Sequence, residues 1–212
     1  MTRFKFAHGS RVLAAAACAA ALAGCASAPP DQFYTLTDSA GAAANPAPPA
    51  AGQTYIEMRP VTVPDQVRRN QMVVAKGAGQ VDLLEHHRWA SKLDDQIGSA
   101  LALGVAAQLG AVNVYSNPAP PGAAVYRISA SVQRFESALD DHALIDVVWS
   151  VRRASEREVL TCRSVFRESV GPGHAGLVAG HRAALAKLSA RIADGVRSQA
   201  AGQAAGCGSQ VS

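Results

Sequence analysis

The stretch VYRISASVQRF, residues 125–135, places apolar side chains at alternate positions over most of its length. A period of two residues is typical of a β-strand, because successive side chains of a strand point to opposite faces of its sheet. Two further β-prone runs follow at residues 143–153 and 158–168, after turn-forming residues at 140–141 and 154–156. Three strands joined by short turns predict an antiparallel meander.

Other strands are expected from shorter β-prone runs. Pro60 interrupts the first of them and indicates a sheet edge or a bulge, because proline cannot donate a ladder hydrogen bond. Gly77-Ala78-Gly79 separates the second from the third and predicts the tight turn of a hairpin. The runs are residues 55–63, 71–76, 80–84 and 112–115.

Two helices are predicted from apolar side chains that recur at helical spacing. The first covers residues 88–109, with Trp89 in its apolar stripe and Gly110 as its stop. The second follows the break at Gly171-Pro172-Gly173 and carries its stripe over residues 177–196. Two long helices packed on a mostly antiparallel sheet predict an α+β domain of two layers.

The N-terminus is typical of an exported bacterial lipoprotein. Arg3, Lys5 and Arg11 precede an apolar run at residues 12–23, which is shorter than the ~20 residues of a membrane-spanning helix. The run ends in the lipobox Leu22-Ala23-Gly24-Cys25, where the Cys25 sulfur would carry a diacylglycerol and its freed amine a third acyl chain. Two or more acyl chains hold a protein stably on a membrane. The alternative is an ordinary signal peptide with an incidental cysteine.

The residue after the lipobox indicates to which membrane the lipoprotein is sorted. Ala26 rather than Asp favours the outer membrane of a Gram-negative bacterium, with the body of the protein on the periplasmic face. Removal of residues 1–24 takes away three basic residues and no acidic one, so the formal net charge falls from +4 to +1. No basic stripe remains that would indicate a nucleic-acid partner.

The mature chain is expected to have three parts. Residues 25–53 are a tether rich in Ala, Pro, Gly and Ser, a composition that stays solvated. Within it, Phe33-Tyr34-Thr35-Leu36 is a short β-prone arm that we expect to dock on the folded body, the alternative being a disordered apolar patch. Residues 54–200 form the domain, and residues 201–212 form a tail.

The cysteines are consistent with export. Cys18 leaves with the signal peptide and Cys25 is the lipidation site, so Cys162 and Cys207 remain. Two cysteines in an oxidising compartment are a natural pair, and their disulfide would join a predicted strand to the tail. The alternative is a buried thiol at Cys162 and a free one at Cys207.

No assembled active site is found in the sequence. A phosphate-binding glycine loop, a Gly-x-Ser-x-Gly elbow and a His-Glu-x-x-His motif are all missing. Glu85-His86-His87 would point apart on a strand or a helix. Asp140-Asp141 suits a turn, and Asp146 is expected to face solvent or to pair with an arginine such as Arg134. We therefore predict a non-enzymatic protein without catalytic residues, cofactor or metal.

Four segments behind the lipobox resemble the ABC-type transport auxiliary lipoproteins, the PqiC-like group, over essentially the whole mature chain. They are the arm at residues 33–36, VPDQVRRNQMV at 63–73 (similar to vPdyldRpqiV), EHHRWASKL at 85–93 (similar to the RWaePL helix start) and LIDVVW at 144–149 (similar to a strand ending in Trp). Gln66, Asn70 and Lys92 depart from the aromatic, Pro and Pro that are usual at these positions.

The resemblance implies an auxiliary component of an MCE-type ABC transport system, which moves lipids between the inner and outer membranes. The implied partners are an MCE-domain periplasmic protein, an inner-membrane ABC/permease complex and further copies of the chain in a homo-oligomeric ring. The alternative is a stand-alone periplasmic lipid- or ligand-binding lipoprotein, with the helix face over residues 93–105 lining a cleft on the sheet. By motif, the predicted partner-docking residues, each of which also fits a structural role, are Asp65, Arg68, Arg69, Gln71, Arg88 and Trp89.

Overall fold

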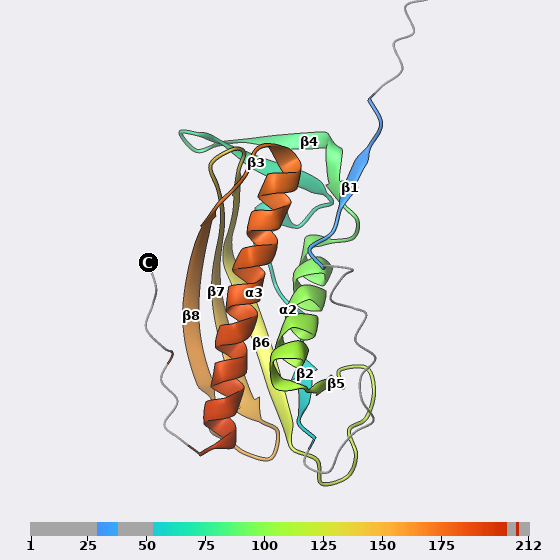
Figure 1. The fold of residues 1–212 in the computed structure, drawn as a ribbon, viewed down its shortest axis with the longest axis vertical. Helices are drawn as coiled ribbons and strands as arrows, with labels where there is room; N and C mark the ends of the chain where they lie inside the picture. Colours follow the sequence, from blue (N-terminus) through green and yellow to red (C-terminus); the bar gives the residue numbers. More distant parts are fainter. Residues whose placement is uncertain (1–28, 38–52, 203–206, 208–212) are drawn as a thin grey trace, which may run out of the picture. The chain divides into compact units, whose positions relative to one another are not determined.

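A computed structural model describes residues 29–37, 53–202 and 207 (Figure 1). They form a five-stranded sheet, a three-stranded sheet and two long helices. The five-stranded sheet has the order β5 (Val112–Asn113), β2 (Tyr55–Met58), β6 (Val125–Ala138), β7 (His142–Arg153) and β8 (Leu160–Ser169). The three-stranded sheet has the order β1 (Gln32–Tyr34), β4 (Gln80–Trp89) and β3 (Gln71–Gly77). The helices are α2 (Leu93–Leu109) and α3 (Gly173–Ala200).

The predicted α+β class with two layers is confirmed. Strands β6, β7 and β8 form the expected antiparallel meander, and α2 and α3 lie side by side on one face of the larger sheet (Figure 1). Alternate side chains of β7 point under the helices, and Ile145, Val147, Trp149 and Val151 are at most 2% exposed. The sequence predicted one mostly antiparallel sheet, whereas the strands form two separate sheets. The predicted strand at 55–63 ends at Met58, because Pro60 lacks an N–H, and resumes only as an isolated bridge from Thr62 to Ser131.

The first helix begins later than predicted. Residues 85–89 belong to β4, and α2 starts at Leu93. Trp89 forms a strand pair with Tyr34 of β1, and its N–H donates to the Asn70 carbonyl at 2.6 Å. The helical spacing from Trp89 to Leu93 misled the prediction because the end of β4 and the start of α2 pack on one core. The predicted stop is confirmed, since Gly110 adopts the left-handed conformation with φ 60°.

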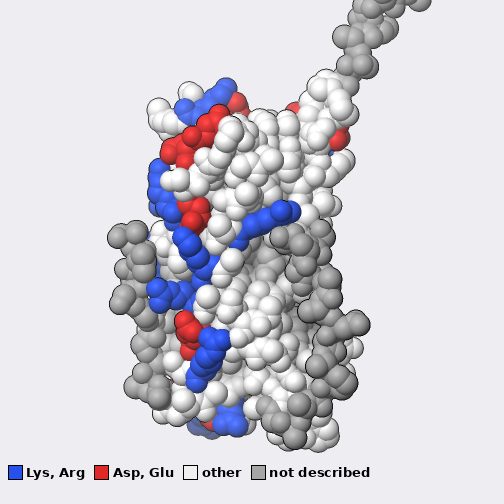
Figure 2. All heavy atoms as spheres, viewed as in Figure 1, with Lys and Arg blue, Asp and Glu red and all other residues white. Residues whose placement is uncertain are grey.

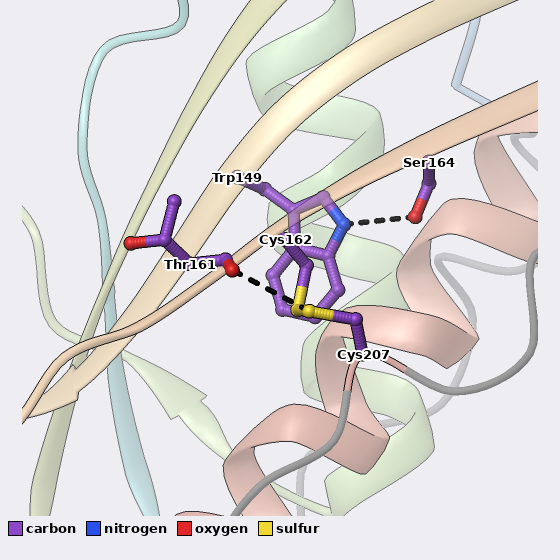
Figure 3. The surroundings of a disulfide bond; sticks show 5 residues. All are labelled: Trp149, Thr161, Cys162, Ser164 and Cys207. Atoms are coloured by element: carbon purple, nitrogen blue, oxygen red, sulfur yellow. Dashed lines mark hydrogen bonds between the residues drawn. A yellow bond between two sulfur atoms is a disulfide. The ribbon is translucent and has the colours of Figure 1, made fainter.

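A disulfide joins Cys162 on β8 to Cys207, with the Cα atoms 5.4 Å apart (Figure 3). The closed loop spans a sequence separation of 45 and includes the whole of α3. Beside it, the Trp149 indole N–H donates to the Ser164 hydroxyl at 3.0 Å, which satisfies the polar atom of a buried ring. A bond over a loop of this length limits the unfolded chain and so favours the folded state.

The two helices approach closely at Gly104. A Cβ atom built on Gly104 would lie 2.8 Å from the Cβ of Ser189 on α3, which is closer than packed carbon atoms lie. A Cβ on Gly98, in the same helix, would meet only the Val61 side chain at an ordinary 3.6 Å. The glycine at 104 therefore allows the helix contact, whereas the glycine at 98 is spatially replaceable.

Alanine substitutions should separate these two glycines. We expect Gly104→Ala to lower the free energy of unfolding by about 1–3 kcal/mol, because α2 and α3 must move apart. Gly98→Ala is the matched control and should raise it by about 0.5–1 kcal/mol through helix propensity alone. Urea denaturation of both variants measures the difference, and equal effects would contradict the close-packing argument.

A buried histidine lies in the core where the two sheets meet. His181 of α3 is fully buried, its ring stacks on Phe135 with centroids 3.9 Å apart, and its Nε2 lies 2.8 Å from the Ser137 hydroxyl. Among the described residues, its Nδ1 has no hydrogen-bond partner. Burial, with a smaller effect from the charge of His142, lowers the pKa of His181 to about 3. The ring is therefore neutral in the folded protein at physiological pH.

Stability should fall in mild acid because of this residue. In the unfolded chain a histidine titrates near 6.5, so between pH 6.5 and 3 the unfolded state binds a proton that the folded state does not. The free energy of unfolding should then decrease by up to about 1.4 kcal/mol per pH unit below 6.5. Urea titrations at pH 7.5 and 5.0, where few carboxylates change charge, should show a smaller decrease in the double variant Ser137→Ala/His181→Phe. An equal decrease in both proteins would refute this assignment.

Candidate docking surface

The arm at residues 33–36 is held by both helices. Leu36 is 3% exposed, and the side-chain carbonyl of Gln96 on α2 accepts from the Leu36 N–H at 2.9 Å and the Thr35 hydroxyl at 3.0 Å. From α3, the Arg182 guanidinium donates twice to the Thr35 carbonyl, at 2.8 and 3.1 Å. A buried backbone amide and carbonyl are thus satisfied by side chains of the body, so the arm is part of the folded structure.

A stack of aromatic rings ties the arm to the start of α3. The Tyr34 hydroxyl lies 2.9 Å from Nδ1 of His87 on β4, and the ring of His87 stacks on that of His174 with centroids 3.6 Å apart. Burial, together with the charge of His87, lowers the pKa of His174. The stack therefore favours the uncharged form of the His174 imidazole.

Strand β1 and the residue before it leave an apolar and a polar group at the surface. The Asp31 carboxylate lies 2.9 Å from Nδ1 of His86 and 3.8 Å from Nε of Arg88. The hydrogen bond from His86, ahead of the charges of Arg88 and His86, holds the pKa of Asp31 below its usual value. Phe33 is 64% exposed, although it is a large apolar side chain. Exposed aromatics beside fixed charges are common at protein interfaces.

The loop before β3 lies next to this group. It contains the short 3-10 helix η2 (Asp65–Val67), in which Val67 is buried while Asp65 and Arg68 form an exposed ion pair. Gln71 opens β3 and is the strand partner of Arg88 on β4. The chain therefore brings two predicted segments, separated in sequence, to one place on the molecule.

We define the docking surface as Asp31, Phe33, Asp65, Arg68, Arg69, Gln71 and Arg88. Trp89 is excluded, because its side chain is only 2% exposed and packs edge-on against Phe135 and His181. The prediction of a docking role for Trp89 is therefore corrected to a core role. Asp31 and Phe33 were not predicted, since only the parallel pairing of β1 with β4 places them beside Arg88.

The free edge of β4 extends the docking surface. Strand β1 pairs with β4 only over His87–Trp89, so in the described part of the chain residues 80–86 have no strand on that side. Two large apolar side chains of this stretch are exposed, Val81 by 41% and Leu83 by 45%. An unpaired strand edge with apolar side chains can accept a strand from a partner. The apolar residues at 81 and 83 were visible in the sequence, but their exposure was not.

The residues considered for chemistry are separated in the structure. His86 contacts Asp31, whereas His87 contacts Tyr34 and His174. Asp146 is 1% exposed and accepts two hydrogen bonds from Arg163 of β8, at 2.8 and 2.6 Å, which confirms the expected pairing with an arginine, although the arginine is Arg163 and not Arg134. This interaction, ahead of the opposing effect of burial, lowers the pKa of Asp146. Among the described residues no group of three His, Cys, Asp or Glu could hold a metal.

Lipidation at Cys25 is a prediction that lies outside the described residues, as does most of the predicted tether. Within the described ranges, no helix has the length and apolar character needed to cross a membrane.

Comparisons with known proteins agree with this geometry. Residues 34–193 match the family model of the ABC-type transport auxiliary lipoprotein component, from the end of β1 into α3. A crystal structure of an uncharacterized protein is similar with a TM-score of 0.62 and 21% identity, covering 79% of this chain and 99% of that one. Protein XCC0632 from Xanthomonas campestris is similar with a TM-score of 0.57 and 14% identity, covering 81% and 99%.

At these identities the two solved structures indicate the fold alone. No curated protein matches the sequence. The family model, by contrast, covers three quarters of the chain and includes η2, all strands after β1 and most of α3. The chain belongs to the family of ABC-type transport auxiliary lipoproteins.

Proposed function

We propose that the protein is the outer-membrane docking component of an MCE-type ABC transport system that moves lipids between the two membranes. The observation that carries the proposal is the family match over residues 34–193. The lipobox at Cys25 and the following Ala26 support anchoring at the periplasmic face of the outer membrane. The role requires binding of partners, not chemistry, and suits a chain whose sequence carries no enzyme motif.

The position of the docking surface supports the same role. Asp31 follows Cys25 by six residues, so a fully extended chain keeps the two within roughly 22 Å. A partner bound at Asp31 and Phe33 would thus be held close to the lipid anchor. A periplasmic MCE-domain protein must exchange its lipid cargo at the membrane, and a docking site near the anchor would place it there.

The partners follow from the family and from the surface. We propose an MCE-domain protein as the direct contact and an inner-membrane ABC/permease complex as the wider assembly. The exposed edge of β4, with Val81 and Leu83, suits either a strand of the MCE-domain protein or a second copy of this chain. A homo-oligomeric ring built through that edge remains part of the proposal.

An affinity pull-down tests the proposed association. The tagged, lipidated protein is recovered from chemically crosslinked cells at native expression, and the eluate is read by mass spectrometry. We expect MCE-domain and ABC subunits with the wild type and a severalfold lower yield with Arg68→Glu/Arg69→Glu, because charge complementarity at an interface is reversed. Arg153→Glu/Arg157→Glu, at the turn between β7 and β8, is the matched control and should keep the yield.

Recovery of the protein alone would contradict the transport association. Equal yields from the two charge-reversal variants would keep the association but exclude the docking surface as its site. Fractionation of the same cells checks the location, since the proposal requires the protein in the outer-membrane fraction.

A groove between the helices favours a second candidate function, the binding of a lipid or other apolar ligand by the protein alone. The predicted cleft beneath the helix face at 93–105 is filled, since Leu93, Ile97, Leu101 and Val105 are at most 1% exposed. Instead a hollow of about 420 Å³ lies between α2 and α3, lined by Leu103, Leu185 and several alanines. The side of α2 in Figure 2 is mostly uncharged, whereas charged residues gather along α3 and β8. Native mass spectrometry that finds no bound lipid would exclude this candidate.

A further inference from the structure

The face of the five-stranded sheet that is turned away from the helices carries a cluster of arginines. A hollow of about 450 Å³ on this face is lined by Arg59, Arg127, Arg152, Ser129, Ser150 and Val159. The intervening residues Ile128 and Val151 are 0% exposed, because they point to the opposite face under α2 and α3. After loss of the signal peptide the formal net charge is only +1, so three guanidinium groups around one hollow are a strong local concentration of charge.

The strand register forces these side chains together. Arg127 of β6 and Arg152 of β7 are direct cross-strand partners, and Ser129 and Ser150 are partners in the next outward-facing row. Like charges directly opposite on neighbouring strands destabilise a sheet. The fold therefore holds two cations side by side above two hydroxyl groups, and the repulsion would be relieved by an anion between them.

The nearby carboxylate neutralises only part of this charge. Glu57 of β2 pairs with Arg127 at 2.7 Å and with Arg59 at 3.0 Å, and the hydrogen bond from Arg127 is the main cause that lowers the pKa of Glu57. The Arg152 guanidinium, in contrast to its backbone within the β6–β7 ladder, has neither a hydrogen bond nor an ion pair to any residue in the described ranges. Three guanidinium groups and one carboxylate leave two positive charges at the hollow.

We propose that this hollow is a binding site for a phosphate group, in which Arg152 and Arg127 hold the anionic oxygens and the Ser129 and Ser150 hydroxyls donate to them. Guanidinium forks match the spacing of phosphate oxygens and bind them with charge-assisted hydrogen bonds. The phosphate could belong to a lipid headgroup or to a small phosphorylated solute, and Val159, 51% exposed, gives the rim an apolar wall. The site is independent of the transport association proposed above, because all of its groups come from one chain.

Calorimetric titration of the full lipidated protein in detergent tests the site. One arm uses inorganic phosphate, and the other uses dihexanoyl-phosphatidylglycerol below its micellar concentration. We expect binding in at least one arm, about tenfold weaker in Arg152→Gln and severalfold weaker in Ser150→Ala. Arg153→Gln is the matched control, because it removes the same charge from the next residue, which pairs with Glu156 at 3.0 Å, and it should bind like the wild type.

The two arms identify the source of the phosphate. Binding of the lipid alone assigns the site to a headgroup, and equal binding of inorganic phosphate assigns it to the phosphate group itself. Absence of binding in both arms, or equal affinities in Arg152→Gln and Arg153→Gln, would overturn the proposal.

A melting experiment adds a readout that is independent of calorimetry. In buffer without phosphate, Arg152→Gln should melt at or above the wild-type temperature, because the cross-strand repulsion is removed. Added phosphate should raise the melting temperature of the wild type and of Arg153→Gln, but not that of Arg152→Gln. A lower melting temperature of Arg152→Gln without phosphate would contradict the repulsion on which the site is argued.

Discussion

Helix α3 lies so close to strand β7 that a side chain at Gly195 has no room. A Cβ atom there would come within 2.9 Å of the Trp149 ring and 3.1 Å of Leu160. This contact sets the height of α3 above the sheet, and α2 takes its position from α3 through the close approach at Gly104. The burial of the large side chains of both helices and of β7 follows from that arrangement, and burial of apolar surface is the main source of stability in such a domain.

The same helix organises the end of the molecule where partners are proposed to bind. His174 at its start stacks on His87 of β4, His181 fills the core beneath Phe135, and Arg182 holds the Thr35 carbonyl of the arm. Three residues within nine positions of one helix thus fix β1 and β4, which carry Phe33 and Arg88 of the docking surface. A change in the packing of α3 on β7 would therefore be felt at that surface without any change in its own residues.

Local patterns in the sequence predicted the helices and strands better than they predicted which strands and side chains pair with one another. The period of two residues identified β6, β7 and β8, and glycine marked the end of α2, because these signals depend on the residues themselves. Trp89 was misplaced because a strand end and a helix start that share a core give the same apolar spacing as one continuous helix. An arginine partner was expected for Asp146, but not Arg163, because that pairing depends on the neighbouring strand and the register between strands is a tertiary property.

The same contrast between local signals and long-range strand pairing holds for the candidate docking surface and for the arginine cluster. Motif resemblance placed the loop at residues 65–71 and Arg88 on one surface, and the Gln71–Arg88 strand pair does bring them together. The arginine cluster could not be foreseen, because Arg59, Arg127 and Arg152 are brought together by the parallel insertion of β2 beside β6 and by the β6–β7 register. Residues that act through long-range strand pairing leave no local signal in a single sequence.

The disulfide gives the molecule a mechanical property. If the proposed lipid anchor and partner both hold the protein, a pull on the anchor would enter the described structure at β1. Through its hydrogen bond to the Thr35 carbonyl, Arg182 would pass that load to α3, which follows β8 along the chain. The disulfide from Cys207 to Cys162 ties the segment after α3 back to β8, so α3 is joined covalently to that strand at both of its ends. Such a force would thereby be shared with the larger sheet instead of being concentrated on the arm.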